Sequence, residues 1–242
     1  MLFFEFGVGG GPRGSVYLRG ADGSPAVRLG DGSAHALSPD GRWAIVQAFG
    51  SRHFDVIPTG PGEAVRLERP GLTLLGARWL PDGRNVVVRA RGERGPAGLY
   101  VLDVRGSAVR RVTPDGFDVA VTRWAVSPDG AMVAVSSETQ VELFPIAGGA
   151  ARGVPAVSGI GRLVGWIERG LLVSEDPEAG GTVFVVDPAT GRRDTWARIT
   201  PRDPAGIMNL NLGTLVTTPD GRGYGYTWHR ATSDLYLVEG VV

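Results

Sequence analysis

Three features of the sequence predict an all-β fold. Its 242 residues include 38 glycines and 17 prolines, a composition typical of a chain with many tight turns. Short apolar runs rich in β-branched and aromatic residues recur, as in residues 42–49 and 98–104, and such runs between turn residues are strand signals. A Pro-Asp-Gly turn also returns about every 40 to 50 residues, the period of four-stranded blades. The sequence therefore predicts a β-propeller of about six four-stranded blades, with the first and last blades incomplete.

The repeated tripeptide is explained by turn geometry. Proline fixes φ near −65°, aspartate can accept a hydrogen bond from the backbone two residues on, and glycine accepts the positive φ that closes a hairpin. We therefore interpret these residues as structural turns with no catalytic role. They are Pro39, Asp40, Gly41, Pro81, Asp82, Gly83, Pro128, Asp129, Gly130, Pro219, Asp220 and Gly221.

A fifth, degenerate copy of the turn is expected between the third and fourth tripeptides. Trp166 precedes Gly170 by the same number of residues as Trp79 precedes Gly83. Residues 166–170 are thus expected to occupy the register of residues 79–83, with Gly170 as a turn glycine. A further Thr-Pro-Asp-Gly at 113–116 breaks the spacing and is placed at the end of a blade.

Each period supplies four strands. One strand leads into the turn, a second follows it, a third comes next, and a Gly-rich turn then leads to a short strand that contains arginine. The second strands are expected at 42–49, 84–91, 131–137, 171–175 and 223–228. The third strands are expected at 54–58, 98–104, 141–147, 182–188 and 233–239. The fourth strands are expected at 60–67, 105–112, 148–154 and 190–196.

The two ends of the chain are expected to form incomplete blades. Residues 2–8, 15–23 and 25–29 match second, third and fourth strands, whereas residues 214–240 supply only the first three. We predict one propeller domain over residues 1–242, with approximate blades at 1–32 (partial), 33–71, 72–116, 117–159, 160–203 and 204–242 (partial). Because an unclosed propeller exposes strand edges, we expect the chain to be part of a longer protein.

Composition excludes several classes of function. The 25 basic and 25 acidic residues cancel, so no net positive field favours nucleic-acid binding. The chain has no cysteine, which excludes disulfides and thiolate metal sites. It also has no lysine, and phosphate-binding loops and kinases require one. It also lacks an apolar run of about 18 residues, so direct membrane insertion is not expected.

The glycines at 9–14 match two phosphate-loop patterns but are better explained as a hairpin. Gly9, Gly11, Gly14 and Val16 satisfy G-x-G-x-x-G-x-V, yet neither the kinase lysine nor a following helix pattern accompanies them. We expect a hairpin between the second and third strands of the first blade. No serine lies in a G-x-S-x-G elbow, and Ala231 replaces the base of a kinase-like His-Arg-Asp. No catalytic residues are therefore predicted.

The remaining polar candidates do not form a recognisable metal site. His35, His53 and His229 lack metal-ligand spacing and are interpreted as surface or turn residues. The acidic segment 175–181 is interpreted as a solvated loop. No metal and no cofactor are predicted.

Two groups of aromatic residues receive different interpretations. Trp79, Trp124 and Trp166 recur before the turns, so packing between blades is expected. Trp228, His229 and Arg230 are expected in the loop after the second strand of the last blade. Loops on a rigid scaffold gather binding residues, and Trp and Arg are enriched at interface hot spots. This loop is the predicted site for a partner or ligand.

The repeats resemble the TolB-like, WD-repeat-like β-propellers of bacteria. The segments 9–46, 77–84, 203–207 and 218–240 further resemble the C-terminal propeller of bacterial membrane-anchored serine/threonine kinases, of the acidobacterial type. The resemblance implies a sensor or interaction module that binds a protein, a peptide or a small ligand, and an extracytoplasmic location if the parent is membrane-anchored. Two alternatives stay open: the accessory propeller of a prolyl-oligopeptidase-type hydrolase and a TolB-like envelope scaffold.

Overall fold

The structure, a computed structural model, describes residues 1–7, 9–119, 124–137, 140–155, 162–174, 181–200 and 207–230, with only the backbone at 207–213 and 228–230. Every regular element among these residues is a β-strand. The chain divides into two compact units. Met1–Ser137 and Glu142–Gly153 form the first unit, and Glu138–Val141 and Val154–Val242 form the second.

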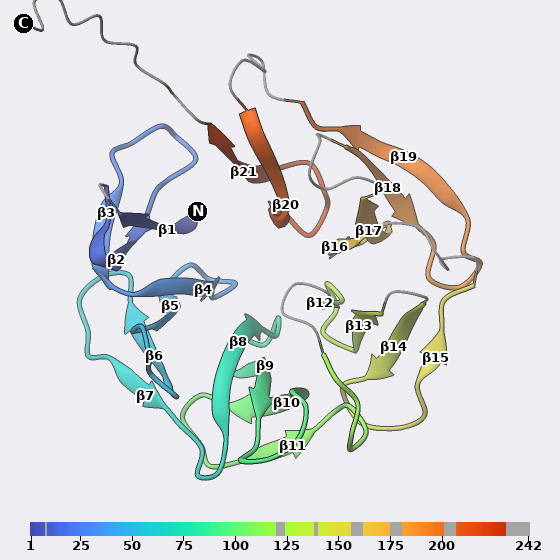
Figure 1. The fold of residues 1–242 in the computed structure, drawn as a ribbon, viewed down its shortest axis with the longest axis horizontal. Coiled ribbons are helices and arrows are strands. Elements are labelled where there is room, and N and C mark those ends of the chain that lie inside the picture. Colours follow the sequence, from blue (N-terminus) through green and yellow to red (C-terminus); the bar gives the residue numbers. More distant parts are fainter. Residues whose placement is uncertain are drawn as a thin grey trace, which may run out of the picture. The chain divides into compact units, whose positions relative to one another are not determined.

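The strands of the first unit form four sheets, in each of which every strand pairs with its neighbours in the sequence (Figure 1). The first sheet contains β1 (Leu2–Gly7), β2 (Gly11–Leu18) and β3 (Val27–Asp31). The second contains β4 (Ser33–Leu37), β5 (Trp43–Gln47), β6 (Phe54–Pro58) and β7 (Val65–Leu67). The third contains β8 (Thr73–Trp79), β9 (Asn85–Arg91), β10 (Gly98–Asp103) and β11 (Val109–Arg111). The fourth contains β12 (Trp124–Val126), β13 (Met132–Ser136), β14 (Val141–Pro145) and β15 (Arg152–Gly153).

The second unit contains two further sheets over its described residues. One is four-stranded, with β16 (Arg162–Ile167), β17 (Gly170–Ser174), β18 (Thr182–Val186) and β19 (Arg193–Arg198). The other pairs β20 (Ile207–Thr217) with β21 (Tyr224–Arg230). The third strand expected at 233–239 lies outside the described residues.

The predicted all-β architecture of repeated four-stranded sheets is confirmed. The first sheet has the three strands assigned to it, and Gly7 of β1 pairs with Gly11 of β2, so Gly11 and Gly14 belong to the second strand of a hairpin. The Thr-Pro-Asp-Gly at 113–116 follows β11, the last strand of its sheet. It therefore closes a sheet, as expected.

Sheets within the first unit bury apolar side chains against one another. One core contains Ile45, Phe54 and Leu67 from the second sheet together with Leu74 and Val88 from the third. The central strands β5 and β9 each bury three consecutive side chains. Strands covered on both faces lose the alternation of a half-exposed strand, which explains why these segments read as continuous apolar runs.

The Pro-Asp-Gly turns have the predicted hydrogen bonds. The carboxylates of Asp40, Asp82, Asp129 and Asp220 each accept a hydrogen bond from the backbone N–H two residues on, at 2.9–3.0 Å. The glycines that follow have φ between 63° and 72°, a conformation that only glycine adopts without strain. The four aspartates and four glycines of these turns thus have a structural explanation.

A hydroxyl group completes three of these turns, which the sequence interpretation missed. Ser127 donates a hydrogen bond to Asp129 at 2.5 Å and accepts one from the backbone N–H of Met132 at 2.9 Å. Ser38 and Thr218 make the same pair of bonds in their own turns. At the third sheet, where Leu80 replaces the hydroxyl residue, Asp82 bonds instead to the side chain and backbone of Asn85.

The expectation that Gly170 is a turn glycine is wrong. Ile167 pairs directly with Gly170, so a two-residue hairpin replaces the five-residue connection between Trp79 and Asn85. Gly170 begins β17 with φ 141°, and a Cβ atom there would lie 2.3 Å from the carbonyl oxygen of Val186. This glycine is required by the close approach of the neighbouring strand β18.

Candidate functional site

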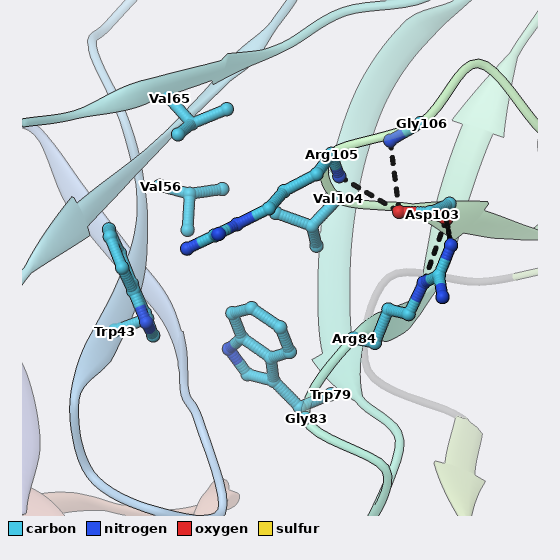
Figure 2. A pocket seen from close by; sticks show the side chains of 10 residues that line it. All are labelled: Trp43, Val56, Val65, Trp79, Gly83, Arg84, Asp103, Val104, Arg105 and Gly106. Carbon is cyan, nitrogen blue, oxygen red and sulfur yellow. Dashed lines mark hydrogen bonds and ion pairs between the residues drawn. The ribbon is translucent and has the colours of Figure 1, made fainter.

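A cavity of about 460 Å³ lies between the second and third sheets of the first unit (Figure 2). Its volume falls within the range of small-ligand sites. Both sheets and the turn after β10 contribute to its wall. The lining residues are Trp43, Val56, Val65, Trp79, Gly83, Arg84, Asp103, Val104, Arg105 and Gly106.

The turn after β10 is fixed by the carboxylate of Asp103. One oxygen accepts hydrogen bonds from the backbone N–H groups of Arg105 and Gly106, both at 2.9 Å. The other accepts from Nε and Nη2 of Arg84 at 3.0 and 2.7 Å. The Arg84 bond, followed by the backbone bonds, lowers the pKa of Asp103. The carboxylate is therefore ionised at neutral pH, and Arg84 compensates its charge.

Arg69 supports the same turn from the connection between the two sheets. Its Nη2 donates hydrogen bonds to the carbonyl oxygens of Asp103 at 2.7 Å and Gly106 at 2.6 Å. The backbone on both sides of Arg105 is consequently held by side chains from elsewhere in the unit. Arg105 projects from a rigid turn.

The side chain of Arg105 reaches from this turn across the cavity to the second sheet (Figure 2). Its guanidinium carbon lies 5.4 Å from the centre of the Trp43 ring, a cation–π geometry. No described residue forms an ion pair or a side-chain hydrogen bond with this guanidinium. The cavity therefore contains one cation that no carboxylate of the described residues neutralises.

Trp79 contributes its ring to the wall of the cavity. Its ring packs against the core shared by the second and third sheets, and its indole Nε1 is buried without an acceptor among the described residues. Figure 2 shows this nitrogen on the side of the ring that faces Trp43 and the Arg105 guanidinium. This nitrogen has essentially no accessible surface, so a ligand in the cavity would contact the ring of Trp79 and not its N–H group.

The structure places Trp228, His229 and Arg230 in strand β21, where their backbones pair with Leu210, Asn209 and Ile207. The expectation of a loop at these residues is wrong, because the strand continues through them. Their side chains lie outside what the structure describes, so their proposed role in binding stays a prediction. They belong to the second unit, and the cavity belongs to the first.

The other aromatic and histidine candidates have structural surroundings. Trp124 is buried in the core between the third and fourth sheets, as predicted for packing. His35 is not a surface or turn residue: it lies in β4, partly buried, with its ring 4.7 Å from that of Phe54. Burial first, and then the charge of Arg78, lowers the pKa of His35 to about 4. Its imidazole is neutral at pH 7.

Sequence interpretation missed Trp43 and Arg105 as site residues. Arg105 lies in an ordinary Gly-containing hairpin, and Trp43 follows a turn whose chemistry is fully explained. Neither position carries a local signal for binding, because the site arises only when two sheets pack together.

No group of three or more potential metal ligands occurs among the described residues. Over the same part of the chain, the structure contains no helix with the length and apolarity needed to cross a membrane.

No protein-family model and no curated protein matches the chain. Solved structures do match its fold. TolB from Acinetobacter baumannii is 14% identical, with a TM-score of 0.66 over 94% of this chain and 63% of that one. The putative TolB from Agrobacterium tumefaciens is 15% identical, with a TM-score of 0.68 over 91% of this chain and 79% of that one. Puromycin hydrolase is 19% identical, with a TM-score of 0.57 over 89% of this chain and 38% of that one.

The chain thus spans less than two thirds of the length of the first of these structures, and much less of the hydrolase. At such low identity the likeness concerns the fold alone. Together with the repeated four-stranded sheets, it shows that this chain is an all-β protein with the fold of TolB-like β-propellers.

Proposed function

We propose that the chain is a non-catalytic β-propeller module of about six blades that binds a peptide, a protein or a small ligand. The observation that carries this proposal is the cavity between the second and third sheets, into which the exposed Arg105 presents a guanidinium that has no ion-pair partner among the described residues. A rigid scaffold with an unpaired cation beside an apolar space is suited to holding a ligand. The aspartates of the turns are engaged in hydrogen bonds to their own backbone, which supports the absence of a catalytic role.

The proposed parent protein is a membrane-anchored serine/threonine kinase of the acidobacterial type, in which the propeller would act as an extracytoplasmic sensor. The support for this assignment is the resemblance of the repeats and of residues 218–240 described above. The gene sequence on either side of the codons for residues 1 and 242 tests it. An upstream kinase domain and transmembrane segment are expected, and a gene without them would contradict the assignment.

The likeness to solved structures favours two other assignments equally. Puromycin hydrolase favours an accessory propeller of a hydrolase, for which a downstream G-x-S-x-G domain is expected. The two TolB structures favour an envelope scaffold, for which a signal peptide and no catalytic domain are expected. The same gene sequence separates all three.

The non-catalytic role is tested on the purified chain. Incubation with radiolabelled ATP and, separately, with fluorogenic peptides is expected to give no turnover above that of a heat-denatured sample. A displayed random-peptide library is expected to yield a peptide that binds the folded chain. Turnover in either assay would contradict the non-catalytic role, and a library that yields no binder would contradict a peptide as the ligand.

A further inference from the structure

We propose that the cavity lined by Trp43, Trp79 and Arg105 binds a carboxylate monoanion joined to a flat apolar group. This inference rests on the proposed function and specifies its ligand. The charge, the donors and the walls of the cavity each restrict the ligand in a different way.

The charge of the cavity selects an anion. Asp103 and Arg84 compensate each other at 2.7 Å, so their pair contributes no net charge. Arg69 directs its Nη2 at carbonyl oxygens of the turn, and its charge adds to a positive potential there. Arg105 remains as the unpaired cation that projects into the space. A ligand with one negative charge would neutralise it.

The geometry of Arg105 leaves its donors available. A cation–π contact uses the flat face of a guanidinium, whereas its N–H groups point outward in its plane. The guanidinium stacked over Trp43 can therefore still receive a carboxylate at its edge, where two parallel hydrogen bonds form. The Trp43 ring also fixes the orientation of that edge before the ligand arrives.

The donor count favours a carboxylate over a phosphate. Among the residues that line the cavity, Arg105 is exposed and is the one cation without an ion-pair partner, because Arg84 is paired with Asp103. The paired N–H groups on the edge of one guanidinium match the two oxygens of a carboxylate. They would leave the additional charge and oxygen atoms of a phosphate dianion unsatisfied.

The walls of the cavity favour an apolar body on the ligand. Val56 and Val104 are buried, Val65 is partly buried, and the rings of Trp43 and Trp79 supply flat surfaces (Figure 2). Aromatic rings stack well on such surfaces. A bare inorganic anion would leave this apolar lining in contact with water.

The matched probes are N-acetyl-phenylalanine and its amide, which differ only in the carboxylate. Titration calorimetry with the full chain is expected to give at least tenfold tighter binding of the acid, because a charge-assisted bidentate hydrogen bond is worth at least that factor. Equal binding of acid and amide, or no binding of the acid, would overturn the inference. Displacement of the acid by equimolar inorganic phosphate would overturn the selection for an organic carboxylate.

Two variants and one control assign the effect to the cavity. Arg105→Gln is expected to abolish the preference for the acid over the amide, and Trp79→Phe is expected to weaken binding of the acid several-fold. Arg110→Gln is the control, since Arg110 is an exposed arginine of the same sheet outside the cavity. If Arg110→Gln lost the preference for the acid to the same extent as Arg105→Gln, the effect could not be assigned to the cavity. Thermal melting monitors folding, and the indole N–H resonance of Trp79 in labelled protein is expected to shift when the acid binds.

Two sources of the carboxylate are distinguished by a further pair of probes, acetyl-Gly-Gly-Gly-Phe with a free or an amidated C-terminus. Binding of the free-terminus peptide as tight as that of N-acetyl-phenylalanine indicates the C-terminus of a polypeptide, and weaker binding indicates a small organic acid. A library peptide whose binding is unchanged in Arg105→Gln, combined with a failed acid titration, would overturn this inference alone. Catalytic turnover by the chain would instead overturn the proposed function.

Discussion

A Cβ atom at position 130 would lie 2.6 Å from Cδ of Pro81. The turn of the fourth sheet therefore passes directly over the turn of the third, and the contact leaves no room for a side chain. Gly130 also has φ of 70°. The residue thus satisfies a backbone requirement and a packing requirement at once.

We expect Gly130→Ala to destabilise the protein more than Gly41→Ala. Gly41 has nearly the same φ, 72°, but no atom would lie within 4 Å of an added Cβ. Gly41→Ala should cost about 1 kcal/mol for the left-handed conformation. Gly130→Ala should cost about 1–3 kcal/mol more, because the Cβ overpacks the turn of the third sheet. Urea unfolding of both variants measures the difference, and equal losses would show that the Pro81 contact relaxes freely.

We expect Ser127→Ala to lower the free energy of unfolding by about 1–2 kcal/mol. The substitution removes the hydrogen bond to Asp129 and leaves the Met132 N–H without its side-chain acceptor, and each such loss costs about 1 kcal/mol. Ser107→Ala is the control, since Ser107 is exposed in another turn and should change stability by less than about 0.5 kcal/mol. Similar values for both would contradict a structural role of the hydroxyl.

We expect the turn aspartates to stabilise the fold down to about pH 4 and to lose this effect in stronger acid. The Ser127 hydroxyl, followed by a backbone N–H, lowers the pKa of Asp129 from 3.8. A lowered pKa means that the ionised folded state is favoured above pH 3.8, and this stabilisation disappears as the pH falls through the folded value. Melting temperatures between pH 5 and 2 should therefore fall less steeply in Asp129→Asn than in the unmodified chain. Glu93→Gln, at an exposed carboxylate, should leave the slope unchanged.

We expect His35 to make the protein less stable as the pH falls from 6.5 to about 4. Its pKa is lowered to about 4 in the fold from 6.5, so within this window only the unfolded chain binds the proton. The contribution of His35 to stability is complete above pH 6.5, decreases through the window, and does not fall further below about pH 4. The total is on the order of 3 kcal/mol. His35→Gln should flatten the dependence measured by urea unfolding, whereas His53→Gln should retain it; a dependence retained in His35→Gln would assign it to another group.

Local chemistry explains what the sequence could predict. The Pro-Asp-Gly turns depend on residues within about five positions of each other, so their positions and the hydrogen bonds from the backbone to the aspartates could be inferred directly, although the bonds of the Ser and Thr hydroxyls were missed. The positions of the strands could also be predicted, because β-branched runs lie between those turns. The three strands of the first sheet could be predicted because residues 2–29 align with the second, third and fourth strands of the later repeats.

Contacts between distant segments explain what the sequence could not predict. Gly170 resembles a turn glycine by spacing, yet its conformation is set by the Val186 carbonyl on the next strand. Trp43, Trp79 and Arg105 come from three segments of two sheets, and their shared cavity exists only after packing. Trp228 to Arg230 were assigned to a loop because no residue there marks where β21 ends.

The order of the strands within each sheet has a consequence for folding. Every strand that the structure describes bonds to the strand that precedes or follows it in the chain, so none of these sheets must wait for a distant segment to arrive. Short loops close at little entropic cost, so neighbouring strands can pair before the sheets pack together. Each sheet can therefore form as a nucleus on which the next one docks, as in repeat proteins whose stability adds up from neighbour to neighbour. Damage to one sheet would accordingly spread first to the sheets beside it.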